Sequence, residues 1–182
     1  LDLDLSDNRI PLKALGAIAN ALQDTKFFTQ INLENTGLSV SGLKTLTTSI
    51  KKAQSPLHIS LSKNNLADAG VLCHALKHAK MPLAIDLSSN GIGPNGISAI
   101  ADAIMAARAP LIIVLDPDLK PESAEELRFA IMRATPPIRI KLASAYTQVE
   151  GQDTLCSIPL PIRALEKNWL LEEPQYNAIF HS

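Results

Sequence analysis

The sequence has little of what marks secreted or membrane proteins. Its two cysteines, Cys73 and Cys156, are too few for a disulfide framework, which favours a reducing compartment. The longest apolar runs, such as residues 110–115, are far shorter than the roughly 20 residues that cross a bilayer. We therefore expect a cytoplasmic protein without a membrane span.

Neither sign of charge is in excess. The chain of 182 residues has 17 Lys and Arg against 18 Asp and Glu, which leaves a formal net charge of −1. This balance creates no overall basic field, so we expect no nucleic-acid partner, and any charged binding surface must be local. Hydrophobic residues make up 46% of the chain, enough to bury one sizeable core.

What the sequence does contain is a repeat. The pattern LxLxxNxL, with Leu and Ile interchanged, recurs at residues 3–10, 59–66 and 85–92, and residues 31–38 keep the frame with Thr36 in the asparagine position. Two further copies are degenerate. The first apolar positions follow one another at steps of 28, 28, 26, 28 and 27 residues: Leu3, Ile31, Ile59, Ile85, Ile113 and Ile140. Such a regular period predicts a repeat array.

A helix is predicted after each strand-like piece, because apolar residues such as Leu43, Leu46 and Ile50 recur there at helical spacing. A glycine at the start of these helices would let helix and strand backbones approach closely, at Gly42, Gly70 and Gly96. The third helix has its apolar stripe one residue later than its neighbours, at Leu72, Ala75, Leu76 and Ala79. This offset points His74 and His78 outward.

The predicted strands alternate apolar and polar residues, so one face of the sheet must be exposed to solvent. Helices then cover only the other face, and a curved solenoid results, with the strands on its concave side. The asparagine position has a physical reason, since an amide can both donate to and accept from the backbone of neighbouring turns. We predict that Asn64 and Asn90 are buried in such a ladder, which Thr36 continues in part through its hydroxyl.

In its period, its asparagine position and its helix pattern, the sequence resembles leucine-rich repeat proteins of the ribonuclease-inhibitor type over residues 1–147. The resemblance implies an α/β fold, a right-handed leucine-rich-repeat solenoid of about six repeats, shaped as a horseshoe with a parallel concave sheet and convex helices. It also implies a protein-binding scaffold that is not an enzyme.

The two ends of the chain depart from the array. Residues 148–182 break the period and place Trp169 among apolar residues at helical spacing, so we expect a C-terminal cap over the last repeat. Leu1 already begins a strand, so we expect the array to be truncated at its N-terminal end.

Three patterns in the sequence are typical of chemical sites. Residues 91–96 match GxGxxG between a strand and a helix, but the repeat itself explains these glycines. His74 and His78 have the spacing of two metal ligands on one helix face, yet the repeat places no further ligand nearby. Asp86 and Asp116 form a carboxylate pair on adjacent strands, which a wet sheet face explains. We therefore expect no catalytic residue, no metal and no cofactor.

The partner-binding surface is predicted on the concave face, which runs from acidic through neutral and apolar to basic. Its C-terminal half combines apolar side chains with charges of both signs, and we expect a monomer that binds a protein partner there through Asp86, Ile112, Val114, Asp116, Arg139 and Lys141. The Ala-rich helices favour the repeat region of a bacterial effector, which would act in the host cytoplasm. The alternatives are a GTPase-activating protein of leucine-rich-repeat type and the recognition region of a larger enzyme.

Overall fold

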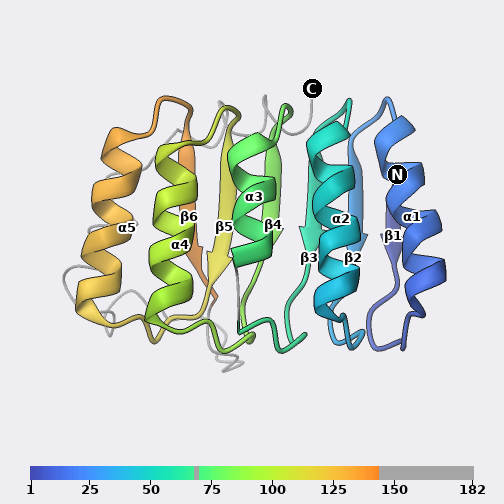
Figure 1. The fold of residues 1–182 in the computed structure, drawn as a ribbon, viewed down its shortest axis with the longest axis horizontal. Helices are drawn as coiled ribbons and strands as arrows, with labels where there is room; N and C mark the ends of the chain where they lie inside the picture. The colour runs from blue at the N-terminus through green and yellow to red at the C-terminus, as the bar shows by residue number, and fades with distance from the viewer. Residues whose placement is uncertain (68–69, 144–182) are drawn as a thin grey trace, which may run out of the picture.

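The structure is a computed structural model that describes residues 1–67 and 70–143. Strands and helices alternate through this part of the chain (Figure 1), as the repeat predicted. The elements are β1 (Asp2–Asp4), α1 (Leu12–Asp24), β2 (Thr29–Asn32), α2 (Val40–Lys52), β3 (Leu57–Ser60), α3 (Gly70–His78), β4 (Leu83–Asp86), α4 (Pro94–Met105), β5 (Leu111–Leu115), α5 (Pro121–Arg133) and β6 (Ile138–Leu142).

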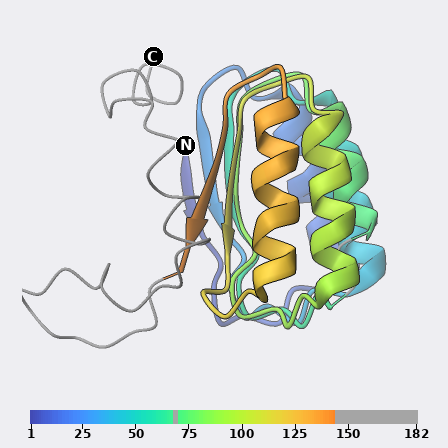
Figure 2. The ribbon, with the colours of Figure 1, turned by 90° about the vertical axis from the view of Figure 1, so that its left-hand side faces the viewer.

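The six strands form one sheet in sequence order, and every neighbouring pair is parallel. The register advances by one repeat per strand, so that Leu3 pairs with Ile31 and each first apolar residue pairs with the next, through to Ile140. Figure 2 shows the strands as one layer and the helices as a second layer on one side of it. The predicted six-strand parallel sheet, covered on one face, is confirmed.

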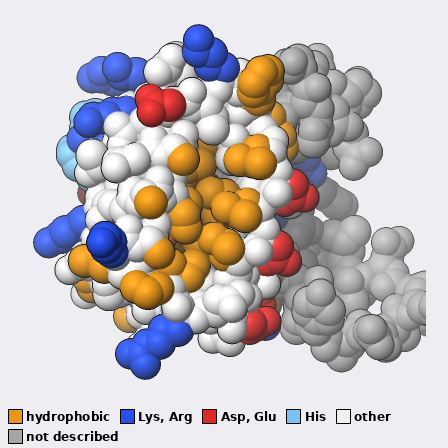
Figure 3. All heavy atoms as spheres, turned by 90° about the vertical axis from the view of Figure 1, so that its right-hand side faces the viewer, with side chains coloured by type: hydrophobic (Ala, Val, Ile, Leu, Met, Phe, Trp, Pro, Cys, Tyr) orange, Lys and Arg blue, Asp and Glu red, His pale blue; other side chains and the backbone are white. Residues whose placement is uncertain are grey.

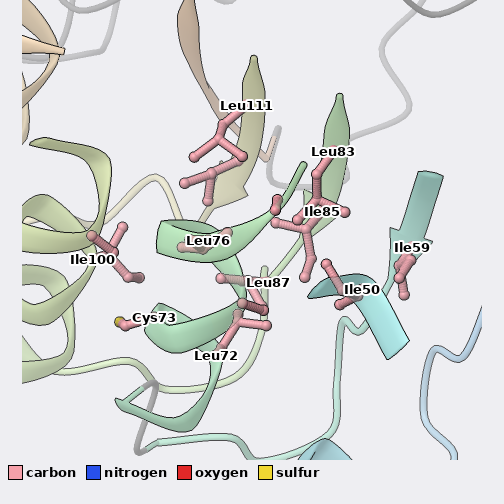
Figure 4. Packing of buried hydrophobic residues seen from close by; sticks show 14 of the residues in the cluster. Ile50, Ile59, Leu72, Cys73, Leu76, Leu83, Ile85, Leu87, Ile100 and Leu111 are labelled. Atoms are coloured by element: carbon pink, nitrogen blue, oxygen red, sulfur yellow. The ribbon is translucent and has the colours of Figure 1, made fainter. Parts of the chain in front are cut away.

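The core lies between the two layers. From Ile31 to Ile140 the paired apolar row is at most 3% exposed, while Leu3 in the first strand is half-buried. Figure 4 shows Leu72 and Leu76 of α3 beside Leu87, flanked by side chains from the neighbouring helices. Each repeat therefore buries its apolar side chains against the repeats before and after it.

The predicted offset of the apolar stripe in α3, by one residue relative to the neighbouring helices, is confirmed. Its offset stripe of Leu72, Ala75, Leu76 and Ala79 is fully buried, and Cys73 beside it is also buried. His74 is exposed and His78 is half-buried. The one-residue offset thus decides which side of this helix carries its histidines.

Gly42 is closely packed, but its nearest neighbours are leucine side chains and not the strand backbone that was predicted. A Cβ atom at Gly42 would lie 2.7 Å from Leu15 Cδ2 and 2.8 Å from Leu38 Cδ1, so a larger residue would require these buried side chains to shift. Gly70, the first residue of α3, is exposed.

The asparagine ladder is confirmed. Asn90 is 1% exposed, and its Nδ2 donates to the carbonyls of Leu61, Leu87 and Ser88 at 2.9–3.2 Å. Asn64 repeats the arrangement one turn earlier, and its Oδ1 accepts from the backbone N–H of Thr36 at 3.1 Å. Thr36 continues the ladder by donating its hydroxyl to Leu33 O at 2.9 Å. Buried backbone groups of the turns are thereby satisfied.

The end of the solenoid at β1 and α1 exposes apolar side chains, which Figure 3 shows gathered on that face. Leu1 is 69% exposed and Leu12 is 52% exposed, while Leu5 and Ile10 are only partly buried. The predicted cap over residues 148–182, with Trp169, lies outside the described residues. In the described part of the chain, no helix has the length and apolar character needed to cross a membrane.

Candidate partner-binding surface

The face of the sheet opposite the helices, called the sheet face below, carries the predicted binding residues in two adjoining rows. In one row Asp86 pairs with Val114, which pairs with Lys141. In the other, Ile112 pairs with Arg139. Asp116 directly follows β5, at the end of the strand. The parallel register therefore gathers the predicted residues on three neighbouring strands.

A hollow of about 770 Å³ opens on the sheet face at the carboxyl ends of the strands. Three of the predicted residues, Asp86, Val114 and Asp116, line it together. Ile112, Arg139 and Lys141 lie outside its lining. The complete lining is Glu34, Ser62, Lys63, Asp86, Ser88, Ser89, Val114, Asp116, Pro117 and Ala143.

Backbone N–H groups hold the two aspartates of the hollow in place. Asp86 Oδ1 accepts from the N–H of Ser88 at 2.9 Å, and Asp116 Oδ1 accepts from the N–H of Ser89. Among the described residues, neither carboxylate has a cationic side chain within 4.0 Å. The hollow therefore presents two fixed negative charges whose remaining acceptor positions can receive hydrogen bonds from a ligand.

The third carboxylate of the hollow is neutralised. Glu34 Oε1 lies 2.6 Å from Lys63 Nζ, and both side chains are partly exposed. The prediction from sequence did not place these two residues in the site. A signal was present, because Glu34, Ser62, Ser88 and Asp116 occupy the same position in successive repeats, directly after the second apolar residue of the motif.

The expectation that Ile112 presents an exposed apolar side chain is wrong. Ile112 is 4% exposed and forms a small cluster with Ala84, against which Phe28 packs. Apolar side chains on this face therefore contact one another instead of standing in solvent, which removes their surface from water. Val114 in the adjoining row is half-buried and keeps an accessible apolar surface beside Asp86.

The glycine-rich pattern at residues 91–96 has a structural role, and the histidine pair is not part of a metal site in the described residues. Within residues 91–96, Ile92 packs against the core and Gly93 precedes α4. The adjoining hollow of about 270 Å³ is lined by two carboxylates, Asp116 and Asp118, and by one cation, Lys120, so its lining carries a net negative charge, which disfavours a phosphate. In residues 1–67 and 70–143, no group of three or more His, Cys, Asp or Glu side chains is placed to hold a metal ion.

Comparison with protein families gives a match to one repeat of the chain. Residues 83–101, which include β4 and the first part of α4, match the family described as "Leucine Rich repeat". None of the curated proteins matches the chain. The match supports a leucine-rich repeat protein, and the six parallel strands with five helices form an α/β leucine-rich-repeat solenoid in the described part of the chain.

Proposed function

We propose that this leucine-rich repeat chain is a protein-interaction scaffold of the ribonuclease-inhibitor type that binds its partner on the sheet face. The observation that carries the proposal is the hollow at the carboxyl ends of the strands, where Asp86 and Asp116 hold negative charges on either side of the apolar Val114. A solenoid sheet presents many side chains on one extended surface, which suits a protein better than a small substrate.

The chemistry of the hollow indicates the partner segment that it would take. Two carboxylates flanking an apolar side chain fit a basic segment that also carries an apolar residue. Arg139 and Lys141 on the last strand give the neighbouring surface the opposite sign, and so fix the orientation of the partner. Ile112 lies in the adjoining row of the same face and packs there against Ala84.

We also propose an oligomeric state and a cellular location. The scaffold acts as a monomer in the cytoplasm, where the buried thiol of Cys73 stays reduced. It has no catalytic role of its own, and any activity belongs to other parts of the protein. In its narrowest form, the chain is the repeat region of a bacterial effector that works in the host cytoplasm.

A matched pair of double variants tests the proposal. Val114→Asp with Arg139→Asp changes the sheet face, and Val40→Asp with Lys44→Asp makes the same chemical changes on the exposed surface of α2. A partner is isolated on the wild-type chain and purified, and its affinity for each variant is measured by calorimetry. We expect the sheet-face variant to lose more than tenfold in affinity and the α2 variant to bind as the wild type does.

Equal affinity of both variants for the partner would overturn the proposal. The melting temperatures of the two variants serve as the control for folding, since both introduce charges at positions outside the main core.

A further inference from the structure

The ends of successive helices bring positive side chains into one hollow, well away from the sheet face. This hollow has a volume of about 570 Å³. Figure 3 shows Lys, Arg and His side chains near one another on the helix side of the molecule. We call the ionisable residues that line the hollow the basic cluster: Lys51, Lys52, His74, His78, Lys80 and Arg108.

Members of the basic cluster from different repeats are close together. Lys51 Nζ, at the end of α2, lies 3.2 Å from His74 Nε2 on α3. The ring centroids of His74 and His78 lie 4.7 Å apart, with the rings nearly perpendicular. Arg108 reaches the same hollow from the segment after α4. A single ligand could therefore contact side chains from three repeats.

No carboxylate neutralises these side chains in the described part of the chain. The ion pairs found there are Lys63 with Glu34 and Arg128 with Glu125, and neither involves the basic cluster. The one charged residue of the neighbouring helix α4 is Asp102, which is exposed and lies beyond 4.0 Å from every cationic group described. On a protein with a net charge of −1, the hollow is thus a local concentration of positive charge.

The environment of His78 reflects this concentration. Burial lowers the pKa of His78 below its usual value, and the positive groups around it lower it further. Those groups are His74 and Lys77 on α3, Lys51 on α2 and Arg108 after α4. An anion in the hollow would reverse this repulsion.

The helix dipole does not by itself explain the basic cluster. A cation near the C-terminal end of a helix is stabilised by the dipole, which accounts for Lys51 and Lys52 in the last turn of α2. Yet α1 and α4 end without a basic residue in the last turn. Arg108 lies beyond the end of α4 and still lines the hollow. A single basic residue, Arg133, lies in the last turn of α5, so most of the positive charge at the helix ends is concentrated at α2 and α3, where Arg108 adds to it.

We propose that the basic cluster binds a small anion that carries two or more phosphate groups. Arg108 offers a planar set of donors that matches a phosphate, and the lysines offer mobile positive charges. The volume of the hollow exceeds what a single phosphate fills, and four permanently cationic side chains favour an anion of high charge. A metal ion does not fit, because Lys51 beside His74 repels a cation.

The test uses calorimetry with inorganic triphosphate on the whole chain. Lys51→Gln with Arg108→Gln removes two charges from the basic cluster. Lys13→Gln with Lys120→Gln removes the same number of charges from exposed positions at the starts of α1 and α5, at the opposite ends of the helices. We expect the first variant to lose more than tenfold in affinity and the second to lose less than threefold. Equal losses in both variants, or no binding by the wild type at physiological ionic strength, would overturn the proposal.

A nuclear magnetic resonance titration of the histidine rings provides a second readout that does not depend on the variants. Triphosphate should raise the pKa of His78 in the wild type, because the anion stabilises the protonated ring against the repulsion of His74, Lys51, Lys77 and Arg108. Affinity should accordingly increase as the pH falls through the titration of His78. An unchanged pKa at saturating triphosphate would contradict binding in this hollow.

The source of the phosphates is distinguished with vesicles of phosphatidylcholine, with and without phosphatidylinositol bisphosphate. Sedimentation of the wild type only with the phosphorylated lipid, lost in the Lys51 and Arg108 variant, supports the proposal and identifies a lipid headgroup. Binding of triphosphate without sedimentation supports it and identifies a soluble anion. Sedimentation that the Lys51 and Arg108 variant retains in full would overturn it.

Discussion

Asn90 Oδ1 accepts a hydrogen bond from the backbone N–H of Asn64, 2.9 Å away in the preceding repeat. The same oxygen accepts from the N–H of Leu66 at 3.1 Å. In the same way, Asn64 Oδ1 accepts hydrogen bonds from the backbone N–H groups of Thr36 and Leu38 in the repeat before it. These side chains join consecutive turns of the solenoid at a position where water does not reach, so the turns are stabilised by their neighbours.

Replacing Asn90 should therefore destabilise the protein more than replacing Asp86. Asn90→Leu leaves the N–H groups of Asn64 and Leu66 without their partner in a buried site, at a cost of about 1–3 kcal/mol. Asp86→Leu changes a half-buried residue on the sheet face and should cost less. Denaturant unfolding of the two variants measures the difference, and equal free energies of unfolding would count against the ladder.

The central row of the core should be more sensitive than its first member. Ile85 is 1% exposed between Ile59 and Ile113, so Ile85→Ala should reduce the free energy of unfolding by about 2–5 kcal/mol. Leu3→Ala in the half-buried first strand should reduce it by a smaller amount. Chemical denaturation compares them, and a larger loss at Leu3 would place the core elsewhere.

Two glycines of neighbouring helices should respond to alanine with opposite signs. At Gly42 the added Cβ meets the packed side chains of Leu15 and Leu38, and the crowding should cost about 1–3 kcal/mol. At Gly16, inside α1, a Cβ meets nothing within 4 Å, so Gly16→Ala should raise stability by about 0.5–1 kcal/mol through helix propensity. Melting temperatures that rise for both variants would show that Gly42 is not tightly packed.

His78 should titrate below 6.5, its ordinary pKa. Because the unfolded chain then binds a proton at a higher pH than the folded chain, the contribution of His78 to stability is complete above about pH 6.5 and falls as the pH drops through its titration. The ring resonances of His78 report its midpoint directly. Lys51→Gln should move that midpoint upward, and a downward shift would contradict the assigned repulsion.

The fold could be predicted from the sequence because the same spacing of apolar residues recurs in successive repeats. The alternation at residues 85–92 sets the strand and its wet face, and Asn90 sets the turn. Even the rotation of α3 followed from a stripe shifted by one residue. The repeat pattern is redundant, so a degenerate copy such as residues 113–119 still forms its strand.

The site could be predicted only in part, because it depends on side chains that the repeat does not constrain. Period-two alternation placed Asp86 and Val114 on the sheet face correctly, but it could not show that Ile112 contacts Ala84 closely enough to be buried. The approach of Lys51 to His74 likewise depends on how far α3 is rotated against α2. The spacing of residues predicts on which face of a strand or helix a side chain lies. It does not predict which side chains of other repeats it contacts.

Carboxylate footprinting of the chain alone and in complex with its partner tests the sheet-face interface most directly. The measurement compares the labelling of Asp86 and Asp116 in the hollow with that of Glu122, Glu125 and Glu126 on α5, read out by mass spectrometry. We predict that the partner protects the two aspartates strongly and leaves the three glutamates labelled as in the free chain. Protection of the glutamates with unchanged labelling of Asp86 and Asp116 would contradict binding on the sheet face.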